Sequence, residues 1–156
     1  GDPEDAWRGV ATPKETVTGD KFAWETRGLP DGRYVVRVAA SDEPGNHEGR
    51  ALSSARDSDP VLVDHSPPEI LNLTMEDGEA KGSARDDVSR IMYLAYSVDG
   101  GRLRLVAPED GILDSTEERF RLRLPEGLQE GLHSLAVQAA DEDGNLATER
   151  VGFEMK

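Results

Sequence analysis

Hydrophobic and polar residues alternate along several short stretches of the first half of the chain, as they do in half-buried β-strands. The pattern covers residues 22–24, residues 34–40 and the short apolar run 61–63. A polar loop, residues 42–49, and a stretch of small polar residues, 50–59, lie between them. Because Gly, Pro and Asp cluster between the apolar stretches, we predict short strands joined by turns.

The second half carries the same pattern more strongly. Residues 70–73 begin it, residues 91–98 are its most apolar segment, and Asp-Gly-Gly at 99–101 is a hairpin turn signal. Phe120, Leu122 and Leu124 then alternate with Arg119, Arg121 and Arg123. No helical period of 3.6 residues persists over a convincing window. We therefore predict an all-β fold, a tandem of antiparallel β-sandwiches.

One stretch of the sequence occurs twice, at an offset of 99 residues. Residues 29–46 read LPDGRYVVRVAASDEPGN and residues 128–145 read LQEGLHSLAVQAADEDGN. The pairs that match outright are Leu29/Leu128, Gly32/Gly131, Val38/Val137, Ala40/Ala139, Asp42/Asp141, Glu43/Glu142, Gly45/Gly144 and Asn46/Asn145. A repeat of this length on a strand-turn pattern indicates two copies of one β-domain.

The division between the copies is predicted at residues 64–68, Asp-His-Ser-Pro-Pro, because two prolines cannot donate to a strand ladder and stiffen a linker. We predict a partial N-terminal module over residues 1–64 and a complete module over residues 65–156. A β-sandwich module takes about 100 residues. The first is therefore expected to be a short variant or an excerpt of something longer.

The pattern LxxGxYxVxVxA at residues 29–40 resembles the segment from strand E to strand F of fibronectin type III and related immunoglobulin-like domains. Residues 66–70 (SPPEI) and 96–101 (YSVDGG) look like the opening segment and a hairpin of bacterial immunoglobulin-like modules. The resemblance implies a β-sandwich of a secreted or surface protein, with Tyr34 as a corner residue, and implies little about activity. His133 takes the corner position in the second copy, so we expect a different bond there.

Charge and composition narrow the possible partners. The chain has 18 Lys and Arg against 32 Asp and Glu, a net charge of −14, which argues against nucleic acid and anionic membrane surfaces as partners. The absence of Cys excludes disulfides, thiolate metal sites and a Cys nucleophile. No run approaches the ~18 apolar residues of a membrane span. The sequence opens without a signal peptide, so an exported protein would have lost it or would carry it upstream.

Two acidic turns, residues 42–46 and 141–145, are the main candidates for cation binding. Acidic side chains on a loop suit Ca²⁺, but the spacing is not that of an EF-hand, and Pro44 stands where the second copy has Asp143. Gly-Asn is also a good turn pair by itself. We favour a structural turn over a cation site, and we predict no metal site, no cofactor and no catalytic residue.

The remaining candidates are isolated along the chain. His47, His65 and His133 show no paired-histidine spacing, and we expect loop or core roles for them. Four aromatic residues could stack on sugars if they were exposed. They are Trp7, Trp24, Tyr93 and Tyr96.

We predict that the chain consists of non-enzymatic structural or interaction modules, a spacer or a protein-binding unit of a larger extracytoplasmic bacterial protein. Its partner would be another protein or a neighbouring domain. The alternative is a carbohydrate-binding accessory module with an exposed aromatic patch near Trp7 or Tyr93. A third possibility is that the partial first module has an open sheet edge that accepts a strand from a partner.

Overall fold

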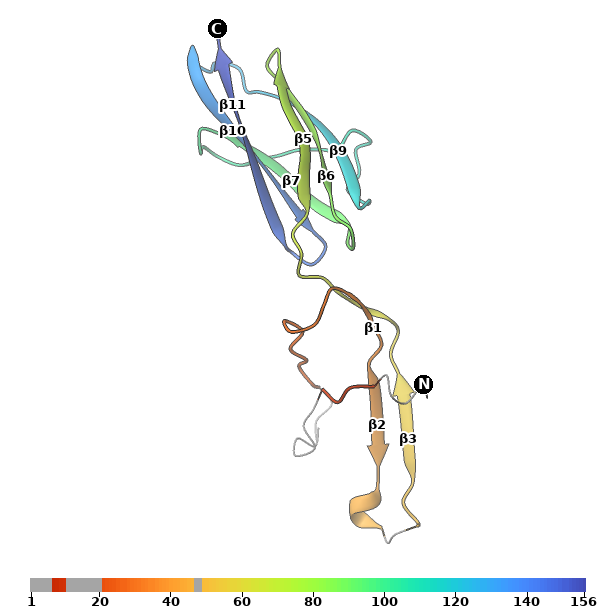
Figure 1. Cartoon of the computed structure of the whole chain (residues 1–156). Helices are drawn as coiled ribbons and strands as arrows, with labels where there is room; N and C mark the ends of the chain where they lie inside the picture. The colour runs from red at the N-terminus through yellow and green to blue at the C-terminus, as the bar shows by residue number, and fades with distance from the viewer. Residues whose placement is uncertain (1–6, 11–20, 47–48) are drawn as a thin grey trace.

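Figure 1 shows a computed structural model of the chain, which describes residues 7–10, 21–46 and 49–156. Apart from one short 3₁₀ turn at Glu43–Gly45, the regular structure of these residues consists of β-strands, and every strand pair is antiparallel. The prediction of an all-β chain with antiparallel strands is confirmed. In the part of the chain that is described, no sheet combines strands from both sides of residues 64–68.

Seven strands follow the linker and form two sheets (Figure 1). The three-stranded sheet has the order β5-β6-β9, with β5 at Glu69–Glu76, β6 at Glu79–Arg85 and β9 at Glu117–Arg123. The four-stranded sheet has the order β11-β10-β7-β8, with β7 at Ile91–Val98, β8 at Arg104–Leu105, β10 at Gly131–Asp141 and β11 at Leu146–Met155. The predicted strand at 91–98 is therefore β7, and the Phe/Leu/Arg alternation lies on β9.

The two sheets of the second half share one hydrophobic core. Buried residues alternate with exposed ones along β9, so its apolar side chains all face the other sheet. The largest fully buried side chains come from both sheets: Phe120, Ile91, Leu94, Leu135 and Val137. This shared core fixes the ends of β6 and β10, and the turns that follow them carry the site described below.

The strands before the linker form one long, interrupted hairpin. β1 (Gly32–Tyr34) pairs with β4 (Val61–Val63), and β2 (Arg37–Ser41) pairs with β3 (Ser53–Asp57). The strand at 61–63 matches a predicted one, but β3 falls in the stretch of small polar residues 50–59, for which the pattern predicts no strand. Its sequence, Ser-Ser-Ala-Arg-Asp, has no apolar alternation because all five residues are exposed. Backbone pairing with β2 makes it a strand.

The predicted strand at 22–24 is wrong, because these residues have no regular structure. Phe22 is exposed, and Trp24 is half-buried with its ring edge-on to the ring of Tyr34 at a centroid distance of 6.1 Å. Trp24 therefore packs on Tyr34 without being part of a strand.

The two copies of the repeated sequence share one local contact. In the first copy the Tyr34 hydroxyl donates a 2.6 Å hydrogen bond to the carbonyl of Pro30, four residues earlier. In the second copy His133 Nε2 lies 2.8 Å from the carbonyl oxygen of Gln129, again four residues earlier. Pro30 and Gln129 are themselves equivalent at the 99-residue offset. The predicted corner therefore forms in both copies, with an imidazole in place of the phenol in the second.

Candidate metal centre

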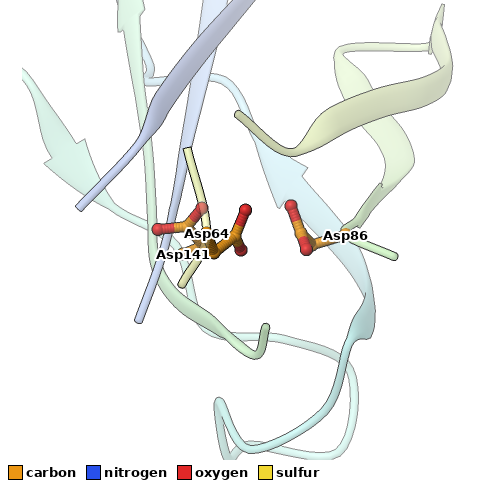
Figure 2. A group of neighbouring side chains, drawn as sticks. All are labelled: Asp64, Asp86 and Asp141. Carbon is orange, nitrogen blue, oxygen red and sulfur yellow. The ribbon is translucent and has the colours of Figure 1, made fainter. Parts of the chain in front are cut away.

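Three buried aspartates meet where the two halves of the chain join (Figure 2). Asp64 follows β4 directly, Asp86 follows β6 directly, and Asp141 is the last residue of β10. Asp64, Asp86 and Asp141 are 5%, 6% and 3% exposed, respectively. One carboxylate oxygen from each aspartate lies within 4.8 Å of the corresponding oxygens of the other two. Among the described residues, this is the one group of three or more acidic or histidine side chains with such a spacing.

Two of the carboxylates are held by turns of the second half. Asp86 Oδ1 accepts hydrogen bonds from the backbone N–H groups of Val88 and Ser89, each 2.8 Å long. Asp141 Oδ1 accepts from the N–H groups of Asp143 and Asn145, each at 2.9 Å, and its Oδ2 accepts from Asn145 Nδ2 at 2.9 Å. Short polar side chains that accept from nearby backbone in this way define turns. The local sequence therefore fixes where these two carboxylates point.

The third aspartate comes from the first half and contacts both of those turns, one through its carboxylate and one through its backbone carbonyl. Asp64 Oδ2 accepts a 2.5 Å hydrogen bond from the Ser89 hydroxyl, and its Oδ1 accepts a 3.1 Å bond from the N–H of Ser66. The backbone carbonyl of Asp64 also accepts from Asn145 Nδ2 at 3.2 Å. Asp64 thus ties the end of β4 to the turn after β6 and to the turn after β10.

The cluster carries negative charge without a positive partner. Within the described ranges, no Lys, Arg or His nitrogen forms an ion pair with any of the three carboxylates. Arg90 forms a bidentate pair with Glu142 instead, at 2.7 and 3.1 Å. Two unit charges about 4 Å apart repel by roughly 4 kcal/mol where the effective dielectric constant is about 20.

Asp143 extends this negative region. Burial raises the pKa of the Asp143 carboxyl, the negative charges of Asp64, Asp141 and Glu142 raise it further, and His65 lowers it. An additional carboxylate therefore lies close enough to the cluster to be affected by its charge. A cation placed among these groups would remove the repulsion that the hydrogen bonds leave uncompensated.

The donor set suits a hard divalent cation, and Ca²⁺ fits it best. Ca²⁺ takes six to eight oxygen ligands at about 2.3–2.6 Å, so two oxygens on opposite sides of it stand about 4.6–5.2 Å apart. The aspartate oxygens lie within 4.8 Å of one another, so one such ion can contact all three. Mg²⁺ keeps several waters and is usually bound by only one or two carboxylates, so a set of three carboxylates favours Ca²⁺. Asp64, Asp86 and Asp141 would supply the first ligands.

Sequence spacing connects only one of the three residues to a cation site. Asp141 lies in the acidic turn 141–145, whereas Asp64 and Asp86 stand in segments that share no motif with it. The equivalent aspartate of the first copy, Asp42, is exposed and accepts a 2.7 Å bond from the N–H of Leu52. The sequence offers only an indirect signal for a cation site: each aspartate stands at the end of a strand, and in the fold these strand ends lie beside the linker.

The histidines and aromatic residues that were candidates from the sequence make other contacts. His65 Nε2 contacts the carbonyl oxygen of Thr26 at 2.9 Å, and His47 is outside the described residues. Trp7 is exposed, but the guanidinium of Arg37 lies 3.9 Å from its ring centroid and covers one face. Tyr96 is buried and Tyr93 half-buried.

Comparison with known proteins adds no family to this picture. The chain matches no protein-family model, and it has no significant match among curated proteins. The described residues include no helix with the length and apolar character needed to cross a membrane. The proposal below therefore depends on the geometry of the junction.

Proposed function

We propose that the chain is a non-enzymatic pair of β-modules that spaces or presents other parts of a secreted or cell-surface protein, and that Ca²⁺ holds its junction stiff. The observation that carries this proposal is the meeting of three buried carboxylates from both sides of the linker. Asp64 comes from the first half, and Asp86 and Asp141 come from the second. A cation bound to all three would join the two halves directly.

The arrangement of the second half supports the spacer interpretation. Its three-stranded and four-stranded antiparallel sheets enclose one core, and this is similar to the layout of fibronectin type III and immunoglobulin-like modules. Such modules carry many functions, so the layout supports the fold and leaves the function to the site. Pro67 and Pro68 form a short stiff connection between the halves.

The cation would act on the angle between the halves. Without it, the hydrogen bonds that tie Asp64 to the turns of the second half are those from Ser89 and Asn145, while the neighbouring carboxylates repel one another. With the cation bound, the three carboxylates would bind one ion instead of repelling one another. The linker residue Asp64 would then be held against both turns. Extracellular calcium modules bind with dissociation constants of about 0.1–1 mM, which matches a site that is filled outside the cell.

Calorimetric melting of the full chain in calcium and again in EDTA tests the proposal. For a dissociation constant near 0.1 mM, 1 mM Ca²⁺ stabilises the folded state by about 1.4 kcal/mol. A change of this size raises the melting temperature of the second half by roughly 5–10 °C. Equal melting temperatures in the two buffers would overturn the cation site.

A pair of variants locates the effect. Asp86→Asn removes one ligand charge and should abolish most of the calcium response. Asp87→Asn is the matched control, because Asp87 is the next residue, is exposed and pairs with Arg85 at 2.8 Å outside the cluster. An unchanged calcium shift in Asp86→Asn would place the ion elsewhere.

A further inference from the structure

Four arginines of the second half have no acidic partner. Arg102 lies shortly before β8, Arg104 on β8, and Arg119 and Arg123 on β9. All four are exposed, and no described carboxylate forms an ion pair with any of them. The chain has 32 acidic and 18 basic residues, so cations are its minority charge. Unpaired arginines that gather on one surface of such a chain reverse its charge locally.

Three of the four lie on one flank of the second half. β8 ends the order β11-β10-β7-β8, and β9 ends the order β5-β6-β9, so each is the edge strand of its sheet. Arg104 is opposite Tyr96 of β7, and the Tyr96 hydroxyl oxygen lies 3.5 Å from the carbonyl oxygen of Arg123. Opposite residues of an antiparallel pair project from the same face. Arg104 therefore projects toward the level of β9 at which Arg123 stands. Arg119 lies elsewhere on β9, in a hollow whose other lining residues are acidic.

Arg102, Arg104 and Arg123, which we call the arginine flank, carry a local excess of positive charge. Glu79 stands opposite Arg123 on β6, but its carboxylate pairs with Arg121 at 3.5 Å. Charges in solution are screened beyond about 8 Å at physiological ionic strength. The charge of the flank, more than the net charge of −14, therefore decides what binds there. All of these residues belong to the continuous described range 49–156.

We propose that the arginine flank binds an acidic peptide segment of a partner protein. The planar guanidinium group presents pairs of N–H donors that match the two oxygens of a carboxylate. Glutamate and aspartate side chains of the segment pair with the three arginines, which have no carboxylate of their own among the described residues. The contact is electrostatic, so it speeds encounter with an acidic partner and selects against a basic one.

Two further observations favour a peptide over an acidic sugar. Leu103 and Leu105 alternate with the arginines along the chain and are 45% and 78% exposed, so apolar side chains of the same peptide have a surface beside the charged one. The aromatic rings of residues 65–156 are all buried or half-buried, so this half presents no exposed ring on which a sugar could stack.

The arginine flank and the calcium junction lie at opposite ends of β9. Glu117, the first residue of β9, is opposite Arg85, which directly precedes Asp86. Arg123, the last residue of β9, is opposite Glu79 at the other end of β6. A chain that failed to bind acidic peptides could therefore still respond to calcium, and the reverse also holds. The two proposals are overturned by different measurements.

The test titrates the full chain with a synthetic six-residue peptide of alternating glutamate and leucine, followed by calorimetry. We expect saturable binding that weakens as sodium chloride is raised. The double variant Arg104→Gln/Arg123→Gln should bind about two- to thirtyfold more weakly, since it loses two exposed ion pairs. The control is Arg150→Gln/Lys156→Gln. It removes the same charge from two exposed residues on and directly after β11, neither of which has a described ion pair.

Two further ligands identify what the flank recognises. A peptide of alternating glutamine and leucine should not bind, because it keeps the apolar side chains and lacks the carboxylates. An oligogalacturonate, which carries carboxylates on a sugar chain, should bind more weakly than the glutamate peptide. Equal binding of the glutamine peptide, tighter binding of the oligogalacturonate, equal losses in the two double variants, or no binding at all would overturn the proposal.

Discussion

At the scale of single residues, the corner of the second copy is made by an imidazole that lies between two acceptors. His133 Nδ1 lies 2.6 Å from Asp99 Oδ2, Nε2 lies 2.8 Å from the Gln129 carbonyl oxygen, and the ring stacks on Phe153. Both ring nitrogens thus face acceptors. A neutral imidazole donates from one nitrogen only, and the imidazolium donates from both. When His133 is protonated, this corner becomes a charged contact with two acceptors, whereas Tyr34 makes its corner with one hydroxyl.

This corner predicts a pH dependence of stability. The Asp99 carboxylate, and then the Gln129 carbonyl, raise the pKa of His133 above its ordinary 6.5. A raised folded pKa stabilises the protein fully below the unfolded pKa, and the contribution is lost as pH rises through the folded value. The pKa of Asp99 is lowered by His133, so its contribution disappears only when pH falls through a value below 3.8. The contact is therefore strongest between about pH 4 and 6.5.

Melting temperatures between pH 5.5 and 8.5 check this prediction. The wild type should lose stability across this range, and His133→Tyr, which restores the residue of the first copy, should lose less. Parallel curves for the two proteins would show that another group titrates.

At the scale of elements, the three-stranded sheet depends on one close approach. Gly82 of β6 pairs with Phe120 of β9, and a Cβ added at Gly82 would stand 2.9 Å from Phe120 Cζ and 3.0 Å from the carbonyl oxygen of Leu71. Both neighbours are held in place, one as a buried ring and one as backbone. The glycine therefore allows the phenylalanine ring to cover the sheet.

Gly82→Ala is expected to destabilise the chain by about 1–3 kcal/mol, the usual cost of overpacking a core. Urea unfolding measures the change. Gly28→Ala is the control, because no atom lies within 4 Å of the added Cβ there. A neutral Gly82→Ala would mean that the ring and the β5 backbone can move apart.

The repeat offers a second prediction at this scale, with its control inside the same chain. Val137→Ala removes two methyl groups from a fully buried site on β10 and should cost about 2–3 kcal/mol. Val38→Ala changes the equivalent exposed position and should stay within about 0.5 kcal/mol. Similar losses at both sites would show that β2 is buried in solution.

At the scale of the whole molecule, the junction decides whether the two halves move together. Asn145 Nδ2 donates to Asp141 Oδ2 at 2.9 Å and to the Asp64 carbonyl at 3.2 Å, so it links a turn of the second half to the end of the first. Its equivalent, Asn46, donates to the carbonyl of Asp42 at 3.1 Å and stays within its own turn. The same position of the repeat thus stabilises its own turn in the first copy and also contacts the other half of the chain in the second.

Asn145→Ala should therefore loosen the junction, whereas Asn46→Ala should not. NMR relaxation reports this through the tumbling of each half. In calcium, we expect the wild type and Asn46→Ala to tumble as one body and Asn145→Ala to tumble more nearly as two. Identical relaxation in all three proteins would exclude Asn145 as a junction contact.

The sequence by itself determined the class of fold and much of the second half. Three features of the second half are visible as local patterns: the apolar run of β7, the alternation along β9 and the Asp-Gly-Gly turn after β7. A strand with one buried face has apolar residues at alternate positions, and a tight turn needs particular residue types, so the order of residues shows both. The 99-residue repeat likewise predicted equivalent corners at Tyr34 and His133, because a corner bond spans only four residues.

Tertiary structure alone decided the rest. The strand β3 has no apolar signature, since its residues are exposed and only its pairing with β2 orders it. The meeting of Asp64, Asp86 and Asp141 depends on how the ends of β4, β6 and β10 come together across the linker, which no local spacing records. Nor can a local pattern distinguish Val38 from Val137, because exposure depends on which strands cover a face, and those strands lie far away in the sequence.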